Sequence, residues 1–454
     1  MERDKIDFGK DRVATLFRKM FVPTLFGMLS ICAVTMADGI FVGHGVGSSG
    51  IAAVNLCIPL LMVFTGLGLM LGVGSSVVAS IHLSTGNEKA ARINVTQALW
   101  ASSLLTLVAG LLILAFPSAT ARLLGASESL ERDTILYLWG FIPCLVFQMW
   151  ESIGLFALRL DGSPKLAMWV NIIGAVVNVV LDWWFIFPLQ MGVFGAALAS
   201  TLAIGIAAAI VFVYLGWKAR HLRFYSLKLT AKSLRLSIRN LGYQCEIGFS
   251  SLLGEATMAV FMYMGNLMFM RYLGDNGVGA FGIACYYCPF VFMMGNAIAQ
   301  SAQPIISYNI STERVRSVKA QHYALITGLF MGLLVMGAFI FAPGELVGLF
   351  IPLDDAAAAI AIEGFPEFGL GVIPFIINLV AIGWYQSVER PWPATCFALL
   401  RGAVFLIPSY IILPHLLGPS GIWLSMPASE SLALLSILLF YLLTKRQSLQ
   451  NQPV

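Results

Sequence analysis

The sequence predicts an all-α integral membrane protein with twelve transmembrane helices in two pseudo-symmetric six-helix lobes. First, 59% of the 454 residues are hydrophobic and 11% are charged, whereas a soluble domain carries about 25% charged residues. Second, Lys and Arg gather on one side of the predicted spans. Third, the two halves of the chain align with each other. Together these features indicate a multi-pass membrane protein.

Twelve apolar stretches are each long enough to cross about 30 Å of hydrocarbon as a helix. The charged first twenty residues lack a nearby cleavage site, so we expect the first stretch to remain as a membrane anchor. The predicted spans of the first half are 16–40, 50–79, 93–116, 134–158, 167–187 and 193–216. Those of the second half are 243–270, 277–307, 321–342, 364–386, 395–413 and 421–443.

The distribution of basic residues predicts that both termini are cytoplasmic. With the N-terminus inside, 23 of the 27 Lys and Arg residues lie in cytoplasmic segments and three lie outside, and such a bias marks the cytoplasmic side of a membrane protein. Residues 217–239 are the longest basic segment, which we interpret as a cytoplasmic linker that touches anionic lipid head groups. It separates an N-terminal lobe, 1–216, from a C-terminal lobe, 240–454. We expect the protein in the cell (inner) membrane.

A shift of 227 residues aligns the two halves of the chain. Gly27 then meets Gly254, and Pro164 meets Pro391. Because each half has six spans, both halves enter the membrane from the same side, as parallel repeats related by an axis along the membrane normal. Two such lobes favour an alternating-access transporter over a channel, which usually closes a ring of subunits around a filter.

Two acidic residues lie inside predicted spans of the first lobe. The stretch "NIIGAVVNVVLDWWFIF", 171–187, places Asn178 and Asp182 one turn apart on one helix face, and Asp38 and Ser200 fall at compatible depths. A charge near the bilayer centre costs at least ~2.5–3.5 kcal/mol. Burial and a second nearby carboxyl both favour a bound proton, and the same oxygen atoms suit Na⁺. We therefore predict a cation site, although the acids could instead only join helices by hydrogen bonds.

The internal repeat provides a control for this prediction. A packing role shared by both lobes would place similar residues at the positions that the 227-residue shift relates to the four site residues. None of those positions is ionisable. They are Gly265, Phe405, Ser409 and Pro427.

The second lobe offers candidates for a substrate surface. Glu255 and Glu430 lie near the middle of their predicted spans, where either could attract a cationic substrate or serve only in packing. Met258, Met262 and Tyr287 belong to Met-rich and aromatic runs. Such side chains repack around varied ligands and attract organic cations, but at helical spacing some of them must face lipid.

Other features narrow the class of protein. Pro23 shares a predicted helix with Asp38, so it is either a hinge that responds to cation binding or a static kink. The sequence has no Walker A motif, so it does not predict ATP-driven transport. It also lacks a nucleophile–base or metal motif. We therefore expect a protein that is not an enzyme, has no cofactor, binds no nucleic acid and is monomeric, with small molecules and lipids as its partners.

Four segments resemble the MATE (multidrug and toxic compound extrusion) family of transporters. They are "MADGIFVGHGVGSSGIAAVN", "GSPKLAMWVNIIGAVVNVVLDWWFIF" with "GVFGAALAS", "AQSAQPIISYN" and "LLRGAVFLIPSYIIL". The resemblance covers nearly the whole chain in order. The chain departs from the family pattern in span 7, where "IGFSS" lacks a proline, and in the loop "HLSTGNE".

The resemblance implies a V-shaped antiporter that exports amphipathic, often cationic, compounds in exchange for H⁺ or Na⁺. It also implies that Asp38, Asn178, Asp182 and Ser200 occupy the family's cation-binding positions. One alternative is a lipid-linked oligosaccharide flippase of the same superfamily, whose cavity should hold several cations, whereas Arg401 is the only basic residue well inside a span. The other alternative is an intramembrane enzyme.

Overall fold

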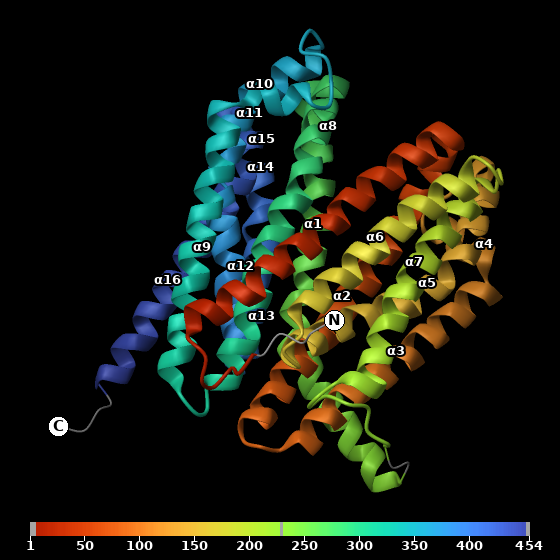
Figure 1. Ribbon diagram of the computed structural model, residues 1–454. Coiled ribbons are helices and arrows are strands. Elements are labelled where there is room, and N and C mark those ends of the chain that lie inside the picture. The colour runs from red at the N-terminus through yellow and green to blue at the C-terminus, as the bar shows by residue number, and fades with distance from the viewer. Residues whose placement is uncertain (1–5, 228–229, 451–454) are drawn as a thin grey trace. The chain divides into compact units, whose positions relative to one another are not determined.

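The computed structural model is helical throughout its membrane-spanning part and describes residues 6–227 and 230–450 (Figure 1). Over these residues, ten helices are long and apolar enough to span a membrane, or eleven if a pair bent by 46° forms one span. The predicted all-α membrane fold is therefore confirmed in this coarser form. The predicted cytoplasmic ends of the chain, residues 1–5 and 451–454, lie outside the described residues, as do 228–229 of the linker.

The chain divides into two compact units. Unit 1 comprises Met1–Glu255 and Gln303–Val318, and unit 2 comprises Ala256–Ala302 and Lys319–Val454. The predicted lobes have different boundaries, because they follow the sequence repeat rather than contacts within the folded chain.

Unit 1 is organised around a long central helix, α5, which packs against α2, α3 and α7, while α6 packs between α1 and α7. Leu138, Leu145 and Met149 of α5 are fully buried in the core. The helices are α1 (Val13–Gly45), α2 (Ser48–Ser84), α3 (Glu88–Ala115), α4 (Pro117–Leu123), α5 (Glu128–Leu160), α6 (Pro164–Ile186), α7 (Gly192–Val213) and the π-helical η1 (Tyr214–Lys218).

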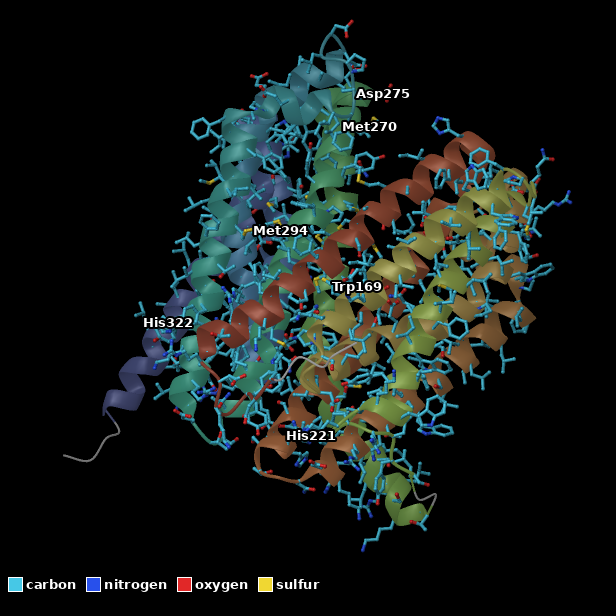
Figure 2. All side chains as sticks on the ribbon, in the orientation of Figure 1. Trp169, His221, Met270, Asp275, Met294 and His322 are labelled. Atoms are coloured by element: carbon cyan, nitrogen blue, oxygen red, sulfur yellow. The ribbon has the colours of Figure 1, made fainter. Side chains whose placement is uncertain are left out.

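Unit 2 has an aromatic core in which Phe269 stacks on Phe281 and meets Trp423 edge-on. Figure 2 shows Met270 and Asp275 at one end of this unit and His322 at the other. Its helices are α9 (Arg314–Phe341), α10 (Pro343–Gly348), α11 (Ala356–Gly369), α12 (Val372–Ser387), α13 (Pro391–Leu399), the π-helical η2 (Leu400–Val404), α14 (Leu406–Leu417), α15 (Pro419–Trp423) and α16 (Ser425–Gln450), with the middle of α8 (Ala231–Asn309).

The 79-residue helix α8 is interrupted at Gly274. An uninterrupted helix of this length would extend roughly 118 Å, about four times the hydrocarbon thickness of a bilayer. Gly274 has φ 63° and ψ −155°, a backbone conformation that glycine adopts without steric cost. The interruption falls between the predicted spans 243–270 and 277–307.

Proline begins helices at equivalent places in the two halves of the chain. Pro164 begins α6 and Pro391 begins α13, as the 227-residue shift aligned them. Pro117 and Pro343 likewise begin the short helices α4 and α10, one residue out of register. Proline suits the first helical position because its missing N–H would be unpaired there. The sequence repeat thus corresponds to a repeat of structural elements.

The linker predicted at 217–239 is not entirely a loop. The π-helical η1 extends to Lys218, and α8 begins at Ala231. Thr230 caps α8 by accepting a hydrogen bond from the Ser233 N–H at 3.3 Å, which satisfies a backbone donor that a helix start leaves free. Nine of the 23 residues of the predicted linker, 231–239, therefore belong to the following helix.

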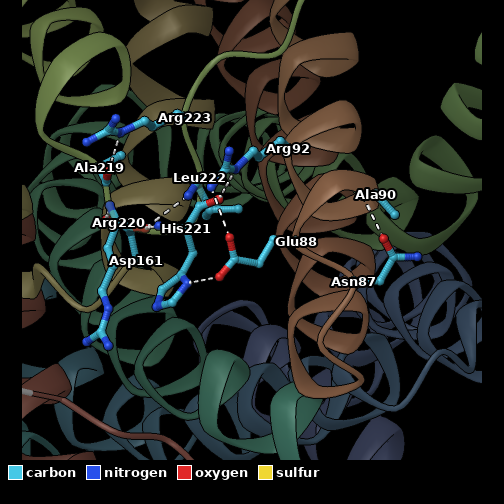
Figure 3. Close-up of polar contacts among 10 residues, drawn as sticks. All are labelled: Asn87, Glu88, Ala90, Arg92, Asp161, Ala219, Arg220, His221, Leu222 and Arg223. Carbon is cyan, nitrogen blue, oxygen red and sulfur yellow. Dashed lines mark hydrogen bonds and ion pairs between the residues drawn. The ribbon is translucent and has the colours of Figure 1, made fainter.

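The linker is attached to unit 1 through two carboxylates (Figure 3). Buried Asp161 accepts backbone N–H bonds from Arg220 at 2.8 Å, His221 at 2.7 Å and Leu222 at 3.1 Å. Glu88 contacts Nδ1 of His221 at 2.6 Å. Because one carboxylate holds three successive N–H groups, the start of the linker has a single fixed conformation.

We expect Asp161→Asn to loosen the linker locally. The amide keeps the shape of the side chain but has one acceptor oxygen instead of two, so at least one buried N–H loses its partner, at a cost of about 1–3 kcal/mol. Hydrogen exchange at residues 220–222 should accelerate by roughly ten- to a hundredfold if these amides exchange by local opening. The exposed Asp354 gives the matched control, Asp354→Asn. Unchanged exchange in Asp161→Asn would contradict this account.

Residues 303–318 join unit 1 because the N-terminal segment binds them. The Arg316 guanidinium donates to the backbone oxygens of Phe8 at 2.8 Å and Asp11 at 2.6 Å. Asn309 also donates to the Phe8 oxygen, at 3.0 Å, and Phe8 contacts the ring of Tyr308. These contacts connect residues about 300 positions apart in the chain.

Candidate functional site

The helix α6 presents Asn178 and Asp182 on its buried face. Its exposed face carries large apolar residues, including Val180 and Trp183. Asn178 has 4% of its surface exposed and Asp182 has 1%, so the i, i+4 spacing expected from the sequence places both in the interior of unit 1. The buried residues of α6 are Pro164, Ala167, Val170, Asn171, Asn178, Asp182 and Ile186.

The structure brings all four predicted cation-site residues together in unit 1. The carboxyl groups of Asp38, on α1, and Asp182 lie close enough to interact electrostatically. Asn178 Nδ2 donates to Ser200 Oγ, on α7, at 3.3 Å. Among the described residues, no other donor reaches either buried oxygen of Asp182 or Oδ1 of Asp38 and of Asn178. The cluster therefore presents carboxylate and amide oxygens that are free to bind a cation or a proton.

Sequence reasoning missed three further polar residues that are buried in unit 1. Tyr137 is buried on α5 and interacts electrostatically with Asp38 and Asp182. Further along α1 and α6, Thr24 Oγ1 and Asn171 Oδ1 are buried without a partner among the described residues. Hydropathy does not single out such neutral residues, but their burial in a membrane helix would have made them candidates.

Pro23 lies on the same helix as Asp38. The helix α1 extends from Val13 to Gly45 with Pro23 inside it, and the proline is buried. Pro23 removes one backbone hydrogen bond from the helix interior, so the helix is weakened locally without being broken. Its role as a hinge stays a prediction.

Four of the predicted substrate residues, Glu255, Met258, Met262 and Tyr287, lie on α8. Glu255 ends the first segment of unit 1, where its Cβ lies close to Gly66 of α2. In unit 2, Met258 is buried, Met262 is half-buried, and Tyr287 donates to the Leu346 backbone oxygen at 2.9 Å. Their contact with substrate stays a prediction.

Glu430 is paired rather than available for a cationic substrate in this structure. Arg401 donates to its carboxylate from Nη2 at 2.8 Å and from Nε at 3.1 Å, and Asn378 Nδ2 donates to it at 2.7 Å. Arg401 and Glu430 each expose 2% of their surface. The sequence left open whether Glu430 attracts substrate or only packs, and whether Arg401 pairs with an acid of its own lobe. The structure shows that Arg401, 29 residues earlier, pairs with Glu430.

The family assignment follows from comparison with known sequences. The family model MatE matches residues 23–184 and 251–411, most of the chain. The chain belongs to the MATE family. The resemblance expected from the sequence is confirmed, and members of this family are transporters, not enzymes.

Individual MATE relatives agree along the whole chain. The chain is 25% identical over 450 residues to the "Multidrug export protein MepA" of Staphylococcus aureus, covering 98% of both. Its fold is similar, with TM-score 0.88, 21% identity and full coverage of both chains, to an "outward-facing conformation of a multidrug resistance MATE family transporter". It is also similar, with TM-score 0.87 and 20% identity over 97% of this chain and 98% of the other, to a transporter of the MOP superfamily from Pyrococcus furiosus.

Proposed function

We propose that this chain exports amphipathic, often cationic, small molecules in exchange for H⁺ or Na⁺ by alternating access. The observation that carries the proposal is the pair formed by the buried Asp182 and the half-buried Asp38, whose Oδ1 is also buried. The two carboxyl groups interact electrostatically and have no basic partner among the described residues. Two carboxylates in contact repel each other, so a shared proton or a bound cation stabilises them. Export of drugs is supported by the name of the MepA relative.

The coupling mechanism uses this repulsion. When the site binds H⁺ or Na⁺, α1 and α6 pack closely through Asp38 and Asp182. When the cation leaves, the two negative charges favour separation of the helices. Pro23 lets α1 bend in response. Cation binding and release thus favour two different arrangements of unit 1, which is the requirement for coupling to substrate.

We propose the full topology of twelve spans, six in each repeat, with both termini cytoplasmic. Dividing α8 at Gly274 and joining α11 with α12 would turn the ten long apolar helices into twelve spans. Ser76 bonds Gln303 at 3.3 Å, and Ser80 bonds Ser307. Each pair differs by 227 residues, the repeat shift, and equivalent residues of a rotational repeat meet only beside its axis. These contacts support two repeats that are related by a rotation axis. We place the protein in the cell membrane as a monomer.

An oligosaccharide flippase is less well supported than an exporter. A pyrophosphate-linked substrate needs unpaired basic groups inside the membrane. Arg401 is the basic residue deepest in a predicted span, and its guanidinium is occupied by Glu430. That pairing favours an exporter of neutral or cationic compounds.

The coupling ion is tested in everted membrane vesicles that take up a fluorescent lipophilic cation. Proton and sodium gradients are collapsed separately with a protonophore and a sodium ionophore. We expect uptake to stop when one gradient is removed and to persist when the other is. Uptake that survives the loss of both gradients would contradict cation coupling.

A further inference from the structure

The buried ion pair of unit 2, Arg401 and Glu430, makes several further contacts. Arg401 lies in the π-helical segment η2, whose irregular backbone leaves a carbonyl for Ser429 Oγ to bond at 3.0 Å. The guanidinium carbon lies 4.4 Å from the ring centroid of Phe375, a favourable cation–π distance. The Arg401 guanidinium thus contacts Glu430 and Phe375, while Ser429 binds the backbone of the same residue.

The carboxylate of Glu430 is correspondingly saturated. Oε1 accepts from Arg401 Nη2, and Oε2 accepts from Asn378 Nδ2 at 2.7 Å. The Glu430 backbone oxygen also accepts from Asn378, at 2.8 Å. Both carboxylate oxygens of Glu430 therefore already accept hydrogen bonds, from two guanidinium nitrogens and one amide.

The acidic cluster of unit 1 differs from this arrangement in one respect. Both clusters combine a buried carboxyl group with an asparagine amide. The unit 1 cluster has two carboxyl groups and no basic partner among the described residues. In unit 2 the carboxylate of Glu430 pairs with the guanidinium of Arg401, which cannot leave because it is part of the chain. The charge of the Asp38–Asp182 cluster therefore depends on an exchangeable cation, and that of the Arg401–Glu430 pair does not.

We propose that Arg401 is a tethered cation that masks Glu430, so that this carboxylate exchanges neither H⁺ nor Na⁺ in the wild-type protein. This inference rests on the proposed cation coupling at Asp38 and Asp182. It makes Arg401 a determinant of how many cations are bound per chain. Removing the guanidinium should convert Glu430 and Asn378 into a second cation-binding site.

The test counts cations bound by the purified full-length protein in detergent. Bound ²²Na⁺ and protons taken up on acidification are measured together, because either ion could fill the site. Arg401→Gln should bind one more cation per chain than Arg401→Gln/Glu430→Gln. Arg401→Lys, which keeps the tethered charge, should bind no more than wild type. In parallel, Asp182→Asn should bind fewer cations than wild type.

The two comparisons separate this inference from the proposed function. Equal cation counts in Arg401→Gln and Arg401→Gln/Glu430→Gln would overturn the masking role of Arg401, whatever Asp182→Asn shows. Equal counts in wild type and Asp182→Asn would instead contradict the cation site of unit 1. If Arg401→Gln fails to fold at acid pH with Na⁺ while the double variant folds, masking is also overturned, because Glu430 then accepts no exchangeable cation in place of the guanidinium.

Discussion

Asp182→Asn should reduce gradient-driven export to the background of protein-free vesicles while leaving insertion and folding largely intact. The amide preserves the shape of a side chain that exposes 1% of its surface and can donate a hydrogen bond to Asp38. It cannot release a proton at physiological pH or supply negative charge. Export is measured in proteoliposomes, and folding by the amount of monodisperse protein.

Two further variants make this result specific. Asp38→Asn should behave like Asp182→Asn, and the double variant should be little worse than either, because changes within one site are not additive. Asn178→Ala removes a neutral ligand and should retain part of the activity. Normal coupled export in either Asp→Asn variant would rule out an essential carboxylate at that position. Loss of the protein from the membrane would support a role in helix packing alone.

Glu430→Gln should destabilise the protein by about 3–5 kcal/mol, because it leaves a buried guanidinium without a counter-charge. Arg401→Gln should cost less, since the remaining carboxylate can bind a proton, whereas arginine cannot lose one. Removing both charges in Arg401→Gln/Glu430→Gln should be the mildest change of the three. Thermal unfolding in detergent, followed by intrinsic fluorescence, measures the differences.

The exposed Glu345 of α10 gives the matched control, since Glu345→Gln removes the same charge without leaving a buried partner. It should leave the unfolding temperature unchanged. Equal destabilisation by Glu430→Gln and Arg401→Gln would show that losing either charge lowers the stability of the protein by the same amount. That result would contradict the predicted asymmetry.

The sequence predicted most of the helices because insertion into a bilayer is decided locally. A stretch of about twenty apolar residues gains enough free energy to cross the membrane regardless of distant residues. Pro164, Pro391 and Gly274 also act locally, by beginning or interrupting a helix. For the same reason the i, i+4 spacing of Asn178 and Asp182 was sufficient to predict a shared, buried face. The position of Asp38 near them was expected from its compatible depth in the first predicted span and from the family resemblance, since spacing along the chain does not relate different helices.

Only the tertiary structure decided which charged groups are paired. Asp38 and Asp182, 144 positions apart, have no basic partner among the described residues. Arg401 and Glu430, 29 positions apart, form an ion pair. It likewise assigned 303–318 to unit 1, through Arg316 and the N-terminal segment. Pairing depends on which helix faces meet, because electrostatic and hydrogen-bond energies act over a few ångströms in space rather than along the chain.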